Sequence, residues 1–165
     1  MDQLQQVPMT FNHANAGLVA GTTSTYTTAA ASVCSIAGKF ATALGAQTNT
    51  ASPTVDATTG LAFVPMVANQ ACVLVWGINA AGAIRLSQGQ IVPTEVGIGT
   101  TAGNFIVAPG FPTLPDDFCP IGYQLVRTSP TGNAFTPGTT AWAASGITCS
   151  VIKNISTLPG RPQIS

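Results

Sequence analysis

Charged residues are scarce in this chain of 165 residues: 6% are Asp, Glu, Lys or Arg, against about 25% in an average soluble domain. Five cations and five anions cancel, and no basic run exists that could neutralise a nucleic-acid backbone. Solubility must then depend on uncharged polar side chains. Such a surface suits a protein held in an assembly, because neutral faces associate with little desolvation of charge. A neutral secreted β-domain is the alternative.

Catalytic side chains are equally scarce. The single histidine, His13, has no acidic neighbour in sequence, and no G-x-S-x-G elbow occurs. The adjacent carboxylates Asp116 and Asp117 follow a proline and favour a turn, although loop carbonyls could complete a calcium shell around them. The sequence therefore predicts no catalytic residue, no metal ligand and no cofactor, and we expect a protein that is not an enzyme.

The cysteines are not clustered, and we expect neither a leader peptide nor a membrane-spanning helix. The four cysteines, Cys34, Cys72, Cys119 and Cys149, contain no C-x-x-C pair that would indicate zinc. The start, "MDQLQQVPMT", lacks the basic and apolar regions of a signal peptide. Polar residues and glycines interrupt the longest apolar stretch, 61–84, so we expect no membrane contact. Synthesis in the cytoplasm then predicts reduced, buried thiols.

Helical periodicity is almost absent, and short apolar runs between Gly, Pro, Asn and Thr are typical of β-strands. Strands are expected near 25–29, 33–36, 62–64, 72–78, 83–88, 105–107, 122–127 and 147–153. The run "CVLVW" (72–76) is apolar on both faces, so one face should pack within the domain and the other against a second sheet or a neighbouring subunit. The stretch 108–120, with four prolines, should be a surface connection and not a central strand. The fold class is all-β, a single β-sandwich or barrel-like domain with extended N- and C-terminal arms.

The expected organisation is an N-terminal arm at 1–20, a β-domain at 21–154 and a C-terminal arm at 155–165. Both ends carry isolated apolar residues on irregular sequence. Arginine and tryptophan are enriched at interfaces, although an outward-facing arginine or a core tryptophan would look the same in sequence. The candidate interface residues are Leu4, Val7, Phe11, Arg85, Arg127, Trp142, Leu158, Arg161 and Ile164.

Several stretches together carry a family likeness: "AGLVAGTTSTYTT", "SIAGKFATAL", "DATTGLAFVPM", "VLVWGINAAGAIRLSQG", "FPTLPDDFCPIGYQLV" and "STLPGRPQIS". In their order and spacing they resemble small structural virion proteins of tailed bacteriophages. The resemblance implies a head decoration (cement) protein. Such a protein would be made in the host cytoplasm and placed on the capsid surface of the virion. Its partners would be the major capsid protein and copies of itself, as a homo-oligomer or as lattice neighbours. A tail- or fibre-associated receptor-binding module is the alternative, and a virion-bound hydrolase is a third hypothesis.

Overall fold

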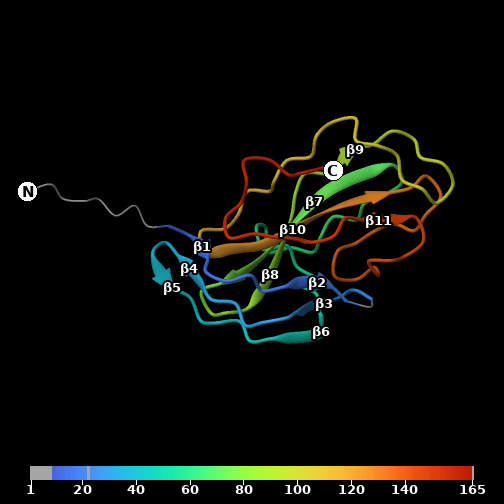
Figure 1. Ribbon diagram of the computed structural model, residues 1–165. Coiled ribbons are helices and arrows are strands. Elements are labelled where there is room, and N and C mark those ends of the chain that lie inside the picture. Colours follow the sequence, from blue (N-terminus) through green and yellow to red (C-terminus); the bar gives the residue numbers. More distant parts are fainter. Residues whose placement is uncertain (1–8, 22, 165) are drawn as a thin grey trace, which may run out of the picture.

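The computed structural model describes residues 9–21 and 23–164, which form β-strands and loops with no helix (Figure 1). The expected all-β class is confirmed. Within these residues, no helix is long and apolar enough to cross a membrane. The strands form three open sheets. Leu4 and Val7, two of the candidate interface residues, lie outside the described residues.

The central sheet has six strands and contains the two longest strands of the described chain as its middle pair. Its members are β11 (Ile147–Cys149), β10 (Phe118–Thr128), β7 (Gln70–Asn79) and β8 (Ile84–Gln88) in that order, with β12 (Lys153–Asn154) beside β10 and β9 (Val92–Pro93) beside β7. All of these pairs are antiparallel. The β7–β8 hairpin turns at "NAAG", where Gly82 has a φ of 78° and the Asn79 side chain accepts a hydrogen bond from the Ala83 amide at 2.9 Å.

Two small sheets complete the fold. One contains β1 (Phe11–Asn12), β4 (Cys34–Ile36) and β5 (Lys39–Phe40); the other contains β2 (Leu18–Ala20), β3 (Thr25–Thr28) and β6 (Gln47–Ala51). Figure 1 places both on the same side of β7 and β10.

The two faces of the central sheet are covered differently. On one, Cys72, Leu74, Trp76 and Ile78 of β7 join a large core with residues of the small sheets, such as Leu18 of β2; we call it the sheet-covered face. The other carries Val73, Val75, Tyr123 and Leu125, packed against side chains from loops and from the C-terminal segment, such as Leu158. We call it the loop-covered face. The chain itself therefore covers both faces of the apolar run 72–76.

A β-bulge in β10 changes which residues face each side. The register with β7 shifts between Pro120 and Gly122. Before the shift, the odd-numbered residue Cys119 points into the core of the sheet-covered face. After the shift, the even-numbered residue Val126 points into the same core. The expectation that 108–120 contributes nothing to a central strand is wrong at its end, because β10 begins at Phe118. Proline is tolerated within this strand because a bulge locally disrupts the ladder of backbone hydrogen bonds.

Two other expected strands are reduced to isolated bridges. Residues 62–64 contribute only the Val55–Ala62 bridge, and residues 105–107 only the Thr94–Phe105 bridge. Conversely, β6 was not expected from the sequence, because its residues, "QTNTA", are mostly polar and lack the apolar alternation of a half-buried strand.

The described parts of both terminal segments lie on the domain. The Asn12 amide of β1 donates to the Ser156 carbonyl at 2.9 Å, and the Leu18 amide of β2 donates to the Asn154 side chain at 2.8 Å. Further along, the Gln163 amide donates to the Tyr123 hydroxyl at 3.1 Å. The described residues of the expected arms thus contribute strands and packing to the domain itself.

Candidate interaction surface

His13 has a partner that sequence spacing did not indicate. Its Nε2 lies 2.7 Å from the Ser35 hydroxyl, and its ring lies between Phe11 and Phe40, with centroids 4.3 and 5.2 Å away. A serine–histidine mechanism also needs a group that orients the imidazole and donors for the oxyanion. The structure gives no hydrogen bond from His13 to a carboxylate among residues 9–164. We therefore interpret this pair as packing and hydrogen bonding at β1 and β4.

The buried carboxylate has a structural role. Asp56 accepts hydrogen bonds from the Thr58 amide at 2.7 Å and from the Gln88 amide at 3.2 Å, which ties its loop to β8. In the described part of the chain, no group of three His, Cys, Asp or Glu side chains is placed to hold a metal ion.

The thiols are core groups and all four are free. Burial raises the pKa of Cys72 and of Cys149 to about 12. Cys34 and Cys119 share a hydrogen bond, which lowers the pKa of Cys34 and raises that of Cys119. Cys34, Cys72 and Cys119 are buried, so the structure presents none of these three as an exposed nucleophile.

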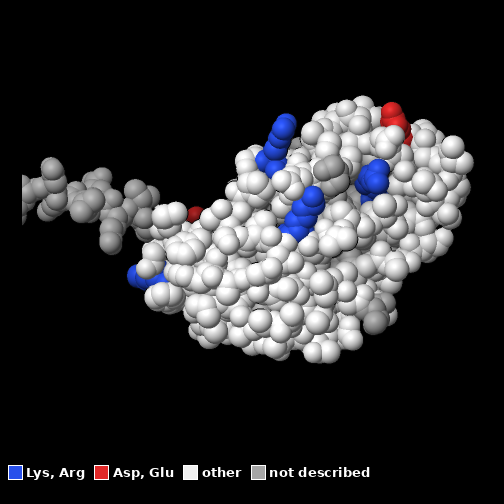
Figure 2. Space-filling model, in the orientation of Figure 1, with Lys and Arg blue, Asp and Glu red and all other residues white. Residues whose placement is uncertain are grey.

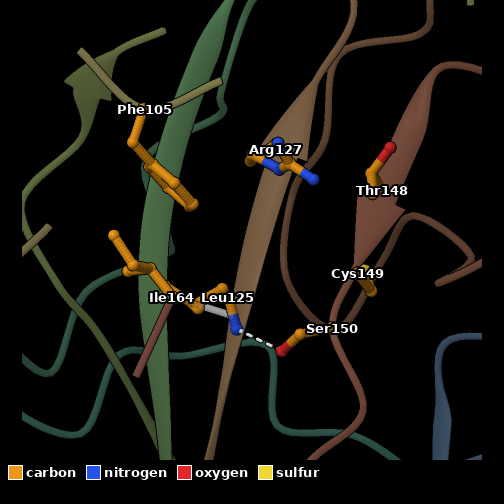
Figure 3. Close-up of a pocket in the computed structure, with 7 residues that line it drawn as sticks. All are labelled: Phe105, Leu125, Arg127, Thr148, Cys149, Ser150 and Ile164. Carbon is orange, nitrogen blue, oxygen red and sulfur yellow. Dashed lines mark hydrogen bonds between the residues drawn. The ribbon is translucent and has the colours of Figure 1, made fainter. Parts of the chain in front are cut away.

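Three neighbouring pockets surround residues 161–164, and we call the area that they form the C-terminal surface. The first pocket, of about 150 Å³, has Phe105, Leu125 and Ile164 as apolar walls. Its other lining residues are Arg127, Thr148, Cys149 and Ser150 (Figure 3). We call it the Arg127 pocket.

The other two pockets share residues with this one or with each other. The second includes Lys153 and Gln163, and the third includes Arg161, Gln163 and Ile164. Since Ile164 also lines the Arg127 pocket, all three meet along the C-terminal segment. Residues from β10, β11, β12 and the C-terminus are therefore neighbours on one surface.

Positive charge gathers on the C-terminal surface. Of the five Lys and Arg residues of the chain, Arg127, Lys153 and Arg161 line these pockets, and none of the lining residues is Asp or Glu. Figure 2 shows three Lys or Arg side chains close together on the face in view, with acidic atoms only towards its edges. A neutral chain thus presents a locally cationic surface.

The Arg127 guanidinium is held in place by two contacts. Its Nη1 donates to the Gly103 carbonyl at 3.0 Å, and its Cζ lies 5.3 Å from the centroid of the Phe105 ring. Among the described residues no ion pair engages this half-buried side chain. Because a guanidinium has five N–H donors, this geometry leaves donors for an anionic ligand while fixing the plane of the group.

Three of the candidate interface residues meet at the C-terminal surface. Arg127 and Ile164 line one pocket, and Arg161 and Ile164 line another. Arg127 lies in β10, whereas Arg161 and Ile164 lie near the C-terminus. They are neighbours because the C-terminal segment folds back over β10. Leu158 lies nearby in the chain but is half-buried, packed against the core of the loop-covered face.

The remaining described candidates lie elsewhere. Arg85 is exposed on β8, and Phe11 lies in β1 against His13. Trp142, a candidate surface anchor, is a core residue: its side chain is 5% exposed, and its Nε1 donates to the Thr25 carbonyl at 2.8 Å. Its ring packs against Trp76 and Phe135, with ring centroids 5.8 and 5.6 Å away. Burial of this large amphipathic ring is possible because the Thr25 carbonyl accepts the hydrogen bond of its N–H group.

Sequence reasoning missed most of the Arg127 pocket. Leu125 shares the strand face of Arg127 by alternation, so that neighbour was accessible from sequence. Phe105, Thr148 and Ser150 come from other segments, and no local pattern connects them to β10.

A second, apolar region is exposed on the loop between β9 and β10. Val96, Ile98, Ile106 and Val107 are all exposed, and Ile98 reaches 87%. Reciprocal backbone hydrogen bonds of 3.1 and 3.0 Å between Ile98 and Thr101 close a tight turn that presents this side chain. An isoleucine held out in this way offers apolar area to a partner.

Comparison of the chain with family models, with curated proteins and with solved structures finds no match.

Proposed function

We propose that this protein is a structural virion component that binds the outside of a phage capsid and stabilises the shell, as a decoration or cement protein. The observation that carries the proposal is the amount of apolar side chain left exposed in a nearly uncharged chain. Thirteen large hydrophobic residues among those described are exposed, including Phe40 at 76% and Val151 at 82%. Soluble monomers usually carry many more charged residues on their surface, so this exposed apolar area in a chain with 6% charged residues supports a role within an assembly.

The architecture is consistent with that role. The two small sheets against the sheet-covered face give a sandwich-like domain that needs no partner to complete its core. The exposed groups are then available for contacts between proteins. On this proposal the C-terminal surface and the apolar loop at 96–107 contribute to docking, with the major capsid protein and neighbouring copies as partners.

The alternative proposal is a receptor-binding module of the tail or its fibres. Glycan recognition commonly uses aromatic platforms, and here Trp76, Trp142, Tyr26 and Tyr123 are all buried. Phe40 is an exposed aromatic side chain, but it stacks on His13 at the edge of a small sheet. The burial of both tryptophans and both tyrosines therefore favours the decoration role over the adhesive one.

Quantitative mass spectrometry of purified particles tests the proposal. The ratio of this protein to the major capsid protein should be near one or a simple fraction of one, because a decoration protein follows the shell lattice. A handful of copies per particle would move the protein to the tail or fibres. Absence from washed particles would overturn both assignments.

A further inference from the structure

The cations of the C-terminal surface and the adjacent acidic pair Asp116 and Asp117 lie on different parts of this neutral chain. The C-terminal surface carries Arg127, Lys153 and Arg161 without a lining carboxylate. Asp116 and Asp117 are exposed on the loop that precedes β10, and neither lines these pockets. A molecule whose opposite charges are separated in this way is electrostatically complementary to a second copy of itself.

The Arg127 pocket has the size and chemistry for a carboxylate side chain. Its volume of about 150 Å³ is below the roughly 300–1,000 Å³ of a site for a drug-sized ligand. The contacts of Arg127 with Gly103 and Phe105 hold the guanidinium before any partner arrives. The Thr148 hydroxyl offers a second polar group on the wall, from the residue paired with Arg127 across β10 and β11. Planar, oriented guanidinium groups bind carboxylates through paired hydrogen bonds.

Asp116 and Asp117 suit the role of the incoming group. They are the adjacent acidic pair of the chain and follow Pro115, whose carbonyl accepts a hydrogen bond from the Phe118 amide at 3.1 Å. This turn immediately precedes the buried start of β10, so the loop projects from a fixed point. Two carboxylates on a short, anchored loop lose little conformational freedom on binding.

We propose that the Arg127 pocket receives the Asp116–Asp117 loop of a second copy of this chain. The contact joins two different surfaces, so it is head-to-tail and generates rings or rows of copies instead of a closed two-fold dimer. The inference rests on the proposed function, which places many copies of this chain on one capsid. Copies on a capsid lattice are held at high local concentration, so a weak contact between them becomes effective.

Sedimentation equilibrium of the purified full chain tests the contact. At low ionic strength and protein concentrations up to about 1 mM, the average mass should rise above that of the monomer, and added salt should reverse the rise. Arg127→Gln and the double variant Asp116→Asn, Asp117→Asn should each weaken association about tenfold. Arg85→Gln removes an exposed positive charge outside the three pockets and serves as the matched control for Arg127→Gln, so it should associate like the unaltered chain.

Charge reversal separates this contact from a general effect of charge. Arg127→Glu alone and the double variant Asp116→Arg, Asp117→Arg alone should both stay monomeric, while an equimolar mixture should associate again, because each reversed surface then meets an opposite one. Circular dichroism of each variant verifies its fold. A monomeric unaltered chain at 1 mM, or a mixture that does not associate, would overturn the inference.

Particle binding by the same variants distinguishes this inference from the proposed function. If the chain self-associates through these residues but does not bind particles, the proposed function fails and the contact stands. If Arg127→Gln loses particle binding without changing self-association, the pocket takes a carboxylate of the shell and the inference of a second copy is wrong.

Discussion

The two faces of the central sheet are formed by the same strands but are covered by different parts of the chain. On the sheet-covered face, two small sheets enclose Trp76, Trp142 and Phe135 in a continuous apolar core. On the loop-covered face, Val73 and Leu125 are covered by irregular segments that leave the Arg127 pocket and its neighbours. Regular sheet packing fills space closely, whereas loops leave gaps that polar and charged side chains can line. Stability should therefore depend most on one face, and recognition on the other.

The largest expected effect is on the sheet-covered face. Trp142→Ala should lower the free energy of unfolding by about 3–5 kcal/mol, because it leaves a cavity among buried rings and removes the hydrogen bond to Thr25. Chemical denaturation followed by circular dichroism measures the change. Leu158→Ala on the loop-covered face is the matched comparison and should cost clearly less, since Leu158 is only half-buried. Equal losses would break the distinction between the faces.

Alkaline pH should weaken the sheet-covered face through its thiols. The pKa of Cys72 is about 12 in the folded protein, above its ordinary value of 9.0, because burial disfavours the thiolate. The unfolded chain therefore loses this proton first as pH rises. The contribution of the Cys72 thiol to the free energy of unfolding is therefore fully present below pH 9. It falls by about 1.4 kcal/mol per pH unit between pH 9 and pH 12. Melting temperatures between pH 8 and 11 should show the decline, and Cys72→Ala should show a shallower one despite its lower starting stability.

Removal of residues 155–165 should affect recognition more than folding. The segment contributes half-buried Ile155 and Leu158, backbone hydrogen bonds to Asn12 and Ile121, and the hydrogen bond from Gln163 to Tyr123. Its loss should cost about 2–4 kcal/mol and leave the domain folded. Binding to particles should drop strongly, because Arg161 and Ile164 are removed from the C-terminal surface. Thermal melting and a particle co-sedimentation assay measure the two effects. Undiminished decoration would contradict the role given to this surface.

The smallest expected effect is that of a reducing agent. The four cysteines are free, so reductant should leave the melting temperature of freshly purified protein unchanged. Differential scanning calorimetry with and without reductant makes the comparison. A drop of several degrees on reduction would reveal a disulfide that constrains the unfolded chain.

Strand positions were predictable where the local pattern is strong. The β7–β8 hairpin follows from apolar runs around "NAAG", and most of β10 follows from its apolar sequence. The start of β10 was not predictable, because the bulge that accommodates Pro120 depends on its pairing with β7. The polar strand β6 was missed because β3 supplies its backbone partners, while its own side chains remain largely solvated.

The candidate surface was predictable only in part. Arg127, Arg161 and Ile164 were selected by residue type and position, yet nothing in sequence indicates that they meet. Trp142 was also selected as an interface residue, but its ring is buried. The local sequence does not distinguish the two outcomes, because a tryptophan in a polar loop has the same neighbours in sequence whether its ring is exposed or buried. The Thr25 carbonyl, far away in the chain, supplies the hydrogen-bond partner that allows its burial.

The sequence by itself determined that this protein is an all-β chain with a neutral, weakly charged surface, because composition and short-range periodicity need no knowledge of contacts. Only the tertiary structure decided which residues of β7 and β10 face each layer, where Trp142 lies and how Arg127 comes beside Ile164. Those outcomes depend on strand register, on one bulge and on a C-terminal segment folded back over the sheet. Each is set by contacts between residues distant in sequence, and no local pattern encodes them.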